Sequence, residues 1–225
     1  MTLASGDMGS LGIAAMIEPQ PLPGSFASPM VTVRDLTVLR GERVLFSELS
    51  FAVEAGGVLL LRGANGVGKS TLLMTLAGIV RADAGGVEGV GRDELHLITY
   101  QSGLKSRLTV RENLTFWREL NGPNGVTEEV ALERLGIGSL AGLEAGYLSS
   151  GQLRRLALGR LLVSVRPIWL LDEPSAALDA DGERLLGALI DEHRALGGIA
   201  IIATHHDLPL ADAGKVRTLT LGGRA

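Results

Sequence analysis

Residues 63–71, with the sequence GANGVGKST, constrain the fold of this chain more than any other stretch. The apolar run 58–61 comes before them and the apolar-rich run 72–77 comes after them, which predicts a strand, a glycine-rich loop and a helix. Glycines let successive backbone N–H groups converge on an anion, and the N-terminal end of the helix adds partial positive charge there. The spacing G-x4-G-K-S therefore predicts a phosphate-binding loop.

This loop predicts a site for a nucleoside triphosphate. Lys69 is expected to reach the terminal phosphates, and the Ser70 hydroxyl is expected to ligate magnesium. A glycine-rich turn that only caps a helix is the alternative, but the strand before the loop and the helix after it favour the nucleotide site. The predicted nucleotide-binding residues of the loop are Gly63, Ala64, Asn65, Gly66, Val67, Gly68, Lys69, Ser70 and Thr71.

The composition fits one domain with a substantial core. The chain has 225 residues, a hydrophobic fraction of 46% and a net charge of −4, so neither disorder nor a surface that coats nucleic acid is expected. It has no cysteine, which excludes disulfides, thiol catalysis and cysteine metal sites. No apolar run is long enough for a membrane span, and residues 1–29 lack the Lys or Arg of a secretory signal. We therefore expect the chain to stay in the cytoplasm.

Two sections precede the phosphate-binding loop. Residues 1–29 are rich in Gly, Pro and Ser, which predicts a flexible extension. Met30 opens the first ordered pattern and is a candidate start of translation, so we expect one domain over 30–225. Short apolar runs between residues 31 and 62, separated by turn residues such as those at 40–42, predict a β-rich section.

The rest of the chain alternates between strand and helix patterns, with a long helical stretch in the middle. Residues 104–165 are predicted to be this helical insertion, and Thr109 with Glu112 forms a capping box at the start of its first helix. The pattern indicates a parallel α/β nucleotide-binding core. The predicted strands of that core are 96–100, 168–172, 199–204 and 216–221, and the predicted helices are 127–135, 151–165 and 179–196.

An apolar strand at 168–172 ends in two carboxylates, Asp172 and Glu173. The carboxyl ends of the strands in an α/β sheet line the crevice where ligands bind. Asp172 is expected to hold magnesium, directly or through water, and Glu173 is placed to orient and deprotonate an attacking water. A strand that ends in a solvated acidic turn is the alternative, and the phosphate-binding loop upstream makes it the weaker one.

Residues 148–152, LSSGQ, open a helix and offer either an anion seat or an ordinary serine N-cap. In order, the chain carries the phosphate-binding loop, Gln101 after a strand, LSSGQ, LLDEP, residues 175–179 and His205 after a strand. From about Met30 to its end the chain resembles the ATP-binding-cassette family. The resemblance implies a phosphate-loop NTPase core of this type, with an N-terminal antiparallel β section and the helical insertion.

In that family, two cassettes face each other and enclose two ATP molecules, so the resemblance implies a second copy of this chain as a partner. It implies that Ser149, Gly151 and Gln152 complete the site of the other copy and that Asp179 lies at the boundary between them. Gln101 would contact magnesium and the attacking water, and His205 would contact the γ-phosphate. ATP and Mg²⁺ are the cofactors implied.

Two positions depart from the family pattern. Ser150 replaces the first glycine of the more common LSGGQ, which is a small change. Arg40 stands where many members stack an aromatic ring on adenine, although a guanidinium also stacks on a base. His96 and His193 are expected to be surface or core residues, and no metal or haem site is predicted.

The runs 100–117, 204–208 and 221–224, together with Arg40, resemble ATP-binding subunits of the haem-export transporters used in cytochrome c maturation. This resemblance implies a peripheral ATPase on the cytoplasmic face of the inner membrane, with a separate transmembrane subunit and haem-handling maturation proteins as partners. Residues 102–120 are then expected to receive the transmembrane subunit. A transporter with another cargo, and a soluble cassette ATPase that acts on ribosomes or DNA, remain as alternatives.

Overall fold

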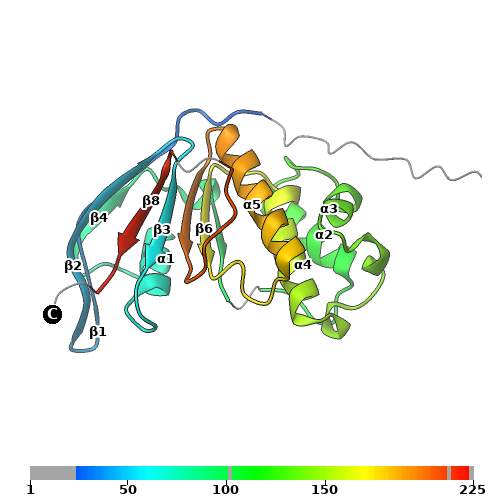
Figure 1. Ribbon diagram of the computed structural model, residues 1–225, viewed down its shortest axis with the longest axis horizontal. Coiled ribbons are helices and arrows are strands. Elements are labelled where there is room, and N and C mark those ends of the chain that lie inside the picture. Colours follow the sequence, from blue (N-terminus) through cyan, green and yellow to red (C-terminus); the bar gives the residue numbers. More distant parts are fainter. Residues whose placement is uncertain (1–23, 101–102, 212–213, 223–225) are drawn as a thin grey trace, which may run out of the picture.

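The computed structural model describes residues 24–100, 103–211 and 214–222. Most of the predicted extension 1–29, as well as Gln101, lies outside this part. The described strands form an antiparallel three-stranded sheet in the order β2-β1-β4 and a parallel five-stranded sheet in the order β5-β6-β7-β3-β8 (Figure 1). This arrangement confirms the predicted α/β phosphate-loop fold with an N-terminal antiparallel β section.

The antiparallel sheet consists of β1 (Met30–Arg40), β2 (Arg43–Glu54) and β4 (Ala84–Glu88). The sequence suggests several short strands here, but the structure joins them into two long ones around the predicted turn. Irregular register between Val33 and Leu36, and again between Leu36 and Val38, bends the β1–β2 pair without ending it. Such bulges preserve the pairing on both sides, and a local hydrophobic pattern does not separate them from strand ends.

The parallel sheet consists of β3 (Val58–Arg62), β5 (Leu95–Ile98), β6 (Ile168–Asp172), β7 (Ile199–Ala203) and β8 (Val216–Thr220). Every residue of β6 and β7 is buried, as expected of strands covered on both faces. Strand β7 lies between β3 and β6. Because the three strands run parallel, the segments that follow them meet at one edge of the sheet.

Helices cover both faces of the parallel sheet (Figure 1). Helix α1 (Lys69–Leu76) packs between the two sheets, where its leucines join an apolar cluster with β1, β3 and β7. On the other face lie α4 (Ser150–Val163) and α5 (Ala180–Ala195), with α2 (Val110–Asn121) and α3 (Glu128–Arg134) further out. The predicted capping box of α2 is present, since Thr109 and Glu112 bond each other's backbone N–H groups. None of the described helices is both long and apolar enough to cross a membrane.

A column of rings connects the N-terminal segment to the parallel sheet. His193 of α5 stacks on Trp169 of β6 with ring centroids 3.8 Å apart, and Phe26 contacts His193 edge-on at 5.4 Å. The backbone N–H of Phe26 also donates to the Leu196 carbonyl at the end of α5, at 2.9 Å. Residues 24–29 therefore lie along the domain in the described structure.

His96 and His193 are both core residues. The His96 ring is fully buried and contacts the Ser164 carbonyl through Nε2, and the His193 ring contacts the Ile199 carbonyl in the same way. Burial lowers the pKa of His96 to about 3, with a further contribution from the nearby charge of Arg160. Burial also lowers the pKa of His193 to about 4. Both rings are therefore neutral in the folded protein at neutral pH.

We predict that the domain loses stability as the pH falls from 6.5 towards 4. Both folded pKa values lie below the ordinary value of 6.5, so the unfolded chain binds more protons in this range. Stability is therefore complete above pH 6.5 and is lost by about 1.4 kcal/mol per pH unit for each histidine. Urea unfolding between pH 7 and 4 measures this slope. His193→Phe should remove about half of it, and an unchanged slope in that variant would contradict the assignment.

Candidate nucleotide-binding site

The phosphate-binding loop connects β3 to α1, as the sequence predicts. Gly68 caps α1 in a left-handed conformation, with φ of 116°, and Gly63 has φ of 136°. A Cβ at Gly63 would lie 2.5 Å from the Leu221 carbonyl oxygen at the end of β8. Position 63 requires glycine for both reasons, because a side chain would strain the backbone and would collide with the backbone of Leu221, directly after β8.

The loop forms one wall of a cavity of about 230 Å³. The tip of the β1–β2 hairpin forms another wall, and the end of β6 closes it. The predicted magnesium ligands Ser70 and Asp172 line this same cavity, and so does Arg40 at the predicted adenine position. The lining residues are Arg40, Leu45, Asn65, Gly66, Gly68, Lys69, Ser70, Thr71, Asp172 and Glu173.

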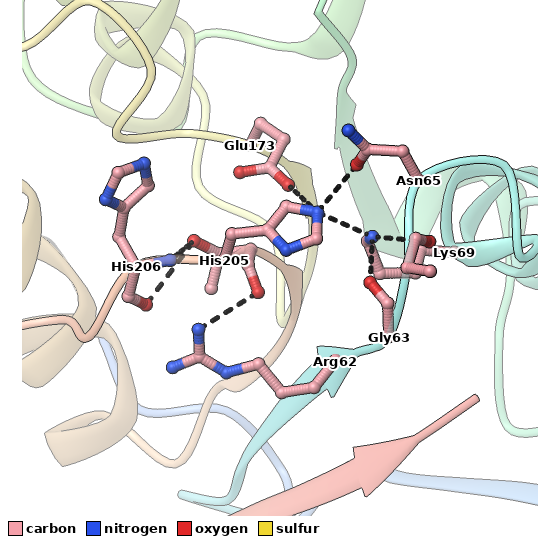
Figure 2. A network of polar contacts seen from close by, with 9 residues as sticks. Arg62, Gly63, Asn65, Lys69, Glu173, His205 and His206 are labelled. Atoms are coloured by element: carbon pink, nitrogen blue, oxygen red, sulfur yellow. Dashed lines mark hydrogen bonds and ion pairs between the residues drawn. The ribbon is translucent and has the colours of Figure 1, made fainter. Parts of the chain in front are cut away.

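Lys69 lies at the centre of the polar contacts in this site. Lys69 is only 7% exposed. Its Nζ donates to the carbonyl oxygens of Gly63 at 2.7 Å and Ala64 at 3.3 Å. The same Nζ lies 2.8 Å from Nε2 of His205 (Figure 2). The buried ammonium group therefore has partners from the loop and from the segment after β7.

His205 brings the three predicted catalytic and phosphate-binding segments together. Its Nε2 lies 2.8 Å from Oδ1 of Asn65 and 3.6 Å from Oε1 of Glu173, in addition to its contact with Lys69 (Figure 2). One ring nitrogen holds either a lone pair or a proton. It can accept from Lys69 or donate to Asn65, so these two contacts compete for the same atom.

Glu173 follows β6 in a conformation that is unusual for a residue with a side chain, with φ of 46°. Its backbone N–H donates to the Ala203 carbonyl at 2.8 Å, which ties the end of β6 to the end of β7. Arg154 of α4 is 6% exposed and close enough to the acidic pair to interact with its charges. Burial lowers the pKa of the Arg154 guanidinium, and the nearby carboxylates of Asp172 and Glu173 act in the opposite direction.

The LSSGQ residues lie at the start of α4 and do not line the cavity of their own loop. The Ser149 hydroxyl accepts from the backbone N–H of Gln152, and the Gln152 side chain accepts from the backbone N–H of Ser149. This reciprocal pair is a capping box. A Cβ at Gly151 would lie 3.0 Å from the Ala177 carbonyl oxygen, so this glycine permits a close approach to the segment after β6.

Asp179 also lies away from that cavity and caps α5 through the backbone N–H of Gly182 at 2.8 Å. Arg155 of α4 pairs with it at 2.7 Å. The bond from Gly182, followed by the contact with Arg155, lowers the pKa of the Asp179 carboxyl. Arg155, Arg154 and Arg62 are not predicted from the sequence, because an arginine beside an apolar run carries no local sign of its partner. Gln101 falls in the gap between the described ranges.

The fold and the arrangement of the site are those of an ATP-binding cassette, and the comparison with protein families agrees. A family model described as "ABC transporter" matches residues 46–176. The chain belongs to the ABC transporter family, as one of its ATP-binding components.

Several curated relatives of the chain carry one name, "Cytochrome c biogenesis ATP-binding export protein CcmA". The protein of this name from Paracoccus denitrificans is 46% identical over 184 residues, covering 82% of this chain and 86% of the relative. The one from Ruegeria pomeroyi is 47% identical over 180 residues, covering 80% and 87%. The one from Rhizobium etli is 41% identical over 206 residues, covering 86% and 96%.

Solved structures of ATP-binding cassettes share the fold. A putative ABC transporter ATP-binding protein from Pyrococcus furiosus has a TM-score of 0.74 and 25% identity, covering 85% of this chain and 97% of the other. A nucleotide-free ATP-binding cassette from an ABC transporter has a TM-score of 0.66 and 25% identity, covering 79% and 82%. The predicted cassette architecture is confirmed by these structures.

We predict that Lys69→Ala weakens ATP binding by roughly ten- to a hundredfold. The substitution removes a charged donor whose bonds to an anion are each worth about 1.5–3 kcal/mol. Equilibrium binding of a fluorescent ATP analogue measures the loss. Lys215→Ala, at an exposed lysine just before β8, is the matched control and should bind normally. Wild-type affinity in the Lys69 variant would contradict the proposed phosphate site.

Proposed function

We propose that this chain hydrolyses ATP to power an ABC transporter that exports haem for cytochrome c biogenesis. The observation that carries the catalytic part is the meeting of Lys69, Glu173 and His205 at one edge of the sheet. The names of the relatives, which describe ATP-binding export proteins of cytochrome c biogenesis, support the cargo and pathway. Isolating the native complex from membranes and identifying its other subunits and bound haem tests this proposal.

The described residues fit a magnesium ion held mainly by ATP and water. Ser70 supplies a hydroxyl and Asp172 a carboxylate to the same cavity, and among the described residues no group of three or more His, Cys, Asp or Glu side chains forms a metal site. Mg²⁺ in phosphate sites is typically bound by one or two carboxylates together with phosphate oxygens, and it keeps several waters. We propose Ser70 and Asp172 as those ligands, together with Gln101. The ion would neutralise charge on the phosphates.

In the proposed reaction, Glu173 orients the attacking water and accepts its proton. Lys69 and the backbone N–H groups of residues 63–71 bind the phosphates, and His205 contacts the terminal one. Such a site works mainly by positioning the reactants and stabilising charge. The contacts of His205 with both Lys69 and Glu173 support this arrangement, because the three groups reach one small volume.

We propose that a second copy of the chain completes each site through Ser149, Gly151 and Gln152, with Asp179 at the boundary. These residues do not line the cavity of their own loop, yet Ser149 and Ser150 are exposed at the start of α4. ATP bound between two copies would favour the closed pair, and loss of the γ-phosphate contacts would favour opening.

We also propose that residues 102–120 receive the transmembrane subunit, which would hold the chain on the cytoplasmic face of the inner membrane. Haem-handling maturation proteins would be further members of the complex. Phe116 and Trp117 contact each other edge-on, and Nζ of Lys105 lies 4.7 Å from the centroid of the Phe116 ring. Leu120 is 61% exposed. Partly exposed rings beside an exposed leucine are typical of a surface that a partner covers.

We predict that Glu173→Gln lowers the ATPase rate of the complex by roughly a hundredfold or more, because it removes the general base. ATP binding should remain, since glutamine preserves the size of the side chain and Lys69 is unchanged. Phosphate release and nucleotide binding measure the two properties separately. Glu54→Gln, at the exposed end of β2, is the matched control. If the Glu173 variant hydrolysed ATP at the wild-type rate, the proposed base would be wrong.

The absence of cysteine from the chain allows a direct test of the docking surface. We predict that Leu120→Cys, labelled with a photoactivatable maleimide, crosslinks to the transmembrane subunit in the intact complex. Ile79→Cys, at a similarly exposed apolar residue after α1, should give no such crosslink. Gel shifts and mass spectrometry identify the products. A product from Ile79 and none from Leu120 would place the partner on another surface.

A further inference from the structure

Arg62 connects the two segments that form the nucleotide site. It is the last residue of β3, directly before the phosphate-binding loop. Its guanidinium donates through Nη1 to the Thr204 carbonyl at 3.1 Å (Figure 2) and through Nη2 to Oδ1 of Asp207 at 2.7 Å. The Arg62 side chain is 20% exposed. It therefore spans from the strand that carries the loop to the segment that carries His205.

Thr204 organises the segment on which His205 sits. This residue is fully buried, and its backbone N–H donates to the Leu61 carbonyl at 3.3 Å. Its side-chain Oγ1 accepts from the backbone N–H of His206 at 3.0 Å. A threonine hydroxyl that bonds the backbone two residues ahead stabilises a turn. His205 is therefore flanked by a carbonyl held by Arg62 and by an N–H held by Thr204.

We propose that Arg62 is a positioning residue that fixes the peptide before His205 and so aims the imidazole at the phosphate site. This inference rests on the proposed role of His205. The Thr204 carbonyl belongs to the same peptide unit as the His205 nitrogen, and peptide units are planar. Holding that carbonyl therefore fixes the direction in which the His205 backbone leaves β7. Because the loop follows directly after Arg62, His205 is aligned to the same strand that positions Lys69.

The two contacts of Arg62 differ in weight. Asp207 is fully exposed, and an ion pair with an exposed carboxylate contributes little to stability. The bond to the Thr204 carbonyl is partly buried and has a charged donor, and such bonds are the stronger kind. The positioning effect is therefore assigned to the bond with the Thr204 carbonyl. The ion pair with Asp207 mainly helps to orient the guanidinium.

The test is a double-mutant cycle in the complete complex with Arg62→Gln and His205→Ala. We expect Arg62→Gln to lower kcat roughly tenfold, because small misplacements of reacting groups are costly, while the KM for ATP stays within about twofold. In the His205→Ala background the same substitution should change kcat by less than about twofold, since the group that it positions is gone. A structural role of Arg62 alone would give the same fold-change in both backgrounds.

Control variants separate the possible failures. Asp207→Asn should keep kcat within about twofold of the wild type, and a loss equal to that of Arg62→Gln would overturn the assignment to the carbonyl bond. Arg184→Gln, at an exposed arginine of α5, controls for the loss of any arginine. If the Arg62→Gln chain does not fold, Arg62→Lys enters the same cycle.

The kcat of His205→Ala alone distinguishes a failure of the proposed role of His205 from a failure of the proposed role of Arg62. Wild-type kcat in that variant would remove the proposed role of His205 and with it the basis of the inference. A slow His205→Ala variant, combined with equal effects of Arg62→Gln in both backgrounds, would overturn the role of Arg62 and leave the proposed ATPase function intact.

Discussion

The parallel pairing of β3, β7 and β6 is the constraint on which the rest of the structure depends. The three strands are neighbours in the sheet and run in the same direction, so their following segments leave from one edge. These segments are the phosphate-binding loop, the stretch that begins with Thr204, and the acidic pair at residues 172–173. Residues more than a hundred positions apart in the chain come into contact for this reason alone. The backbone hydrogen bonds between these strands determine where the three segments meet, and the side chains of the segments supply the chemistry of the site.

That meeting point concentrates charge in a small and partly buried volume. The Lys69 ammonium is supported by two loop carbonyls and by the His205 ring, and the same ring nitrogen is within reach of Asn65 and Glu173. Because Nε2 cannot accept and donate at once, no single protonation state satisfies every contact. A phosphate oxygen that accepted bonds from Lys69 would remove this competition, so we expect bound ATP to change the partners of His205.

Local features of the fold follow well from the sequence, whereas side-chain partners across the sheet do not. The strand–loop–helix unit around Lys69 and the capping box of Thr109 are confirmed because periodicity and capping act within a few residues. The contact of Arg62 with Thr204 spans 142 positions, and it depends on strand order, which hydrophobic patterns do not determine. The stack of His193 on Trp169 is of the same kind. The hydrophobic pattern alone allows His96 and His193 to lie at the surface or in the core, and tertiary packing decides that both are buried.

The start of α4 shows why a structural and a functional interpretation of one motif need not exclude each other. Ser149 acts as an ordinary N-cap, because its Oγ accepts from the backbone N–H of Gln152. A hydroxyl also has one proton to donate, and accepting that bond does not consume it. The cap holds the hydroxyl in a fixed direction at the exposed, positive end of a helix. In the proposed contact, the Ser149 hydroxyl donates its proton to a phosphate of the ATP that the opposite copy binds, while its oxygen still accepts the capping bond. The cap therefore orients the hydroxyl for this contact.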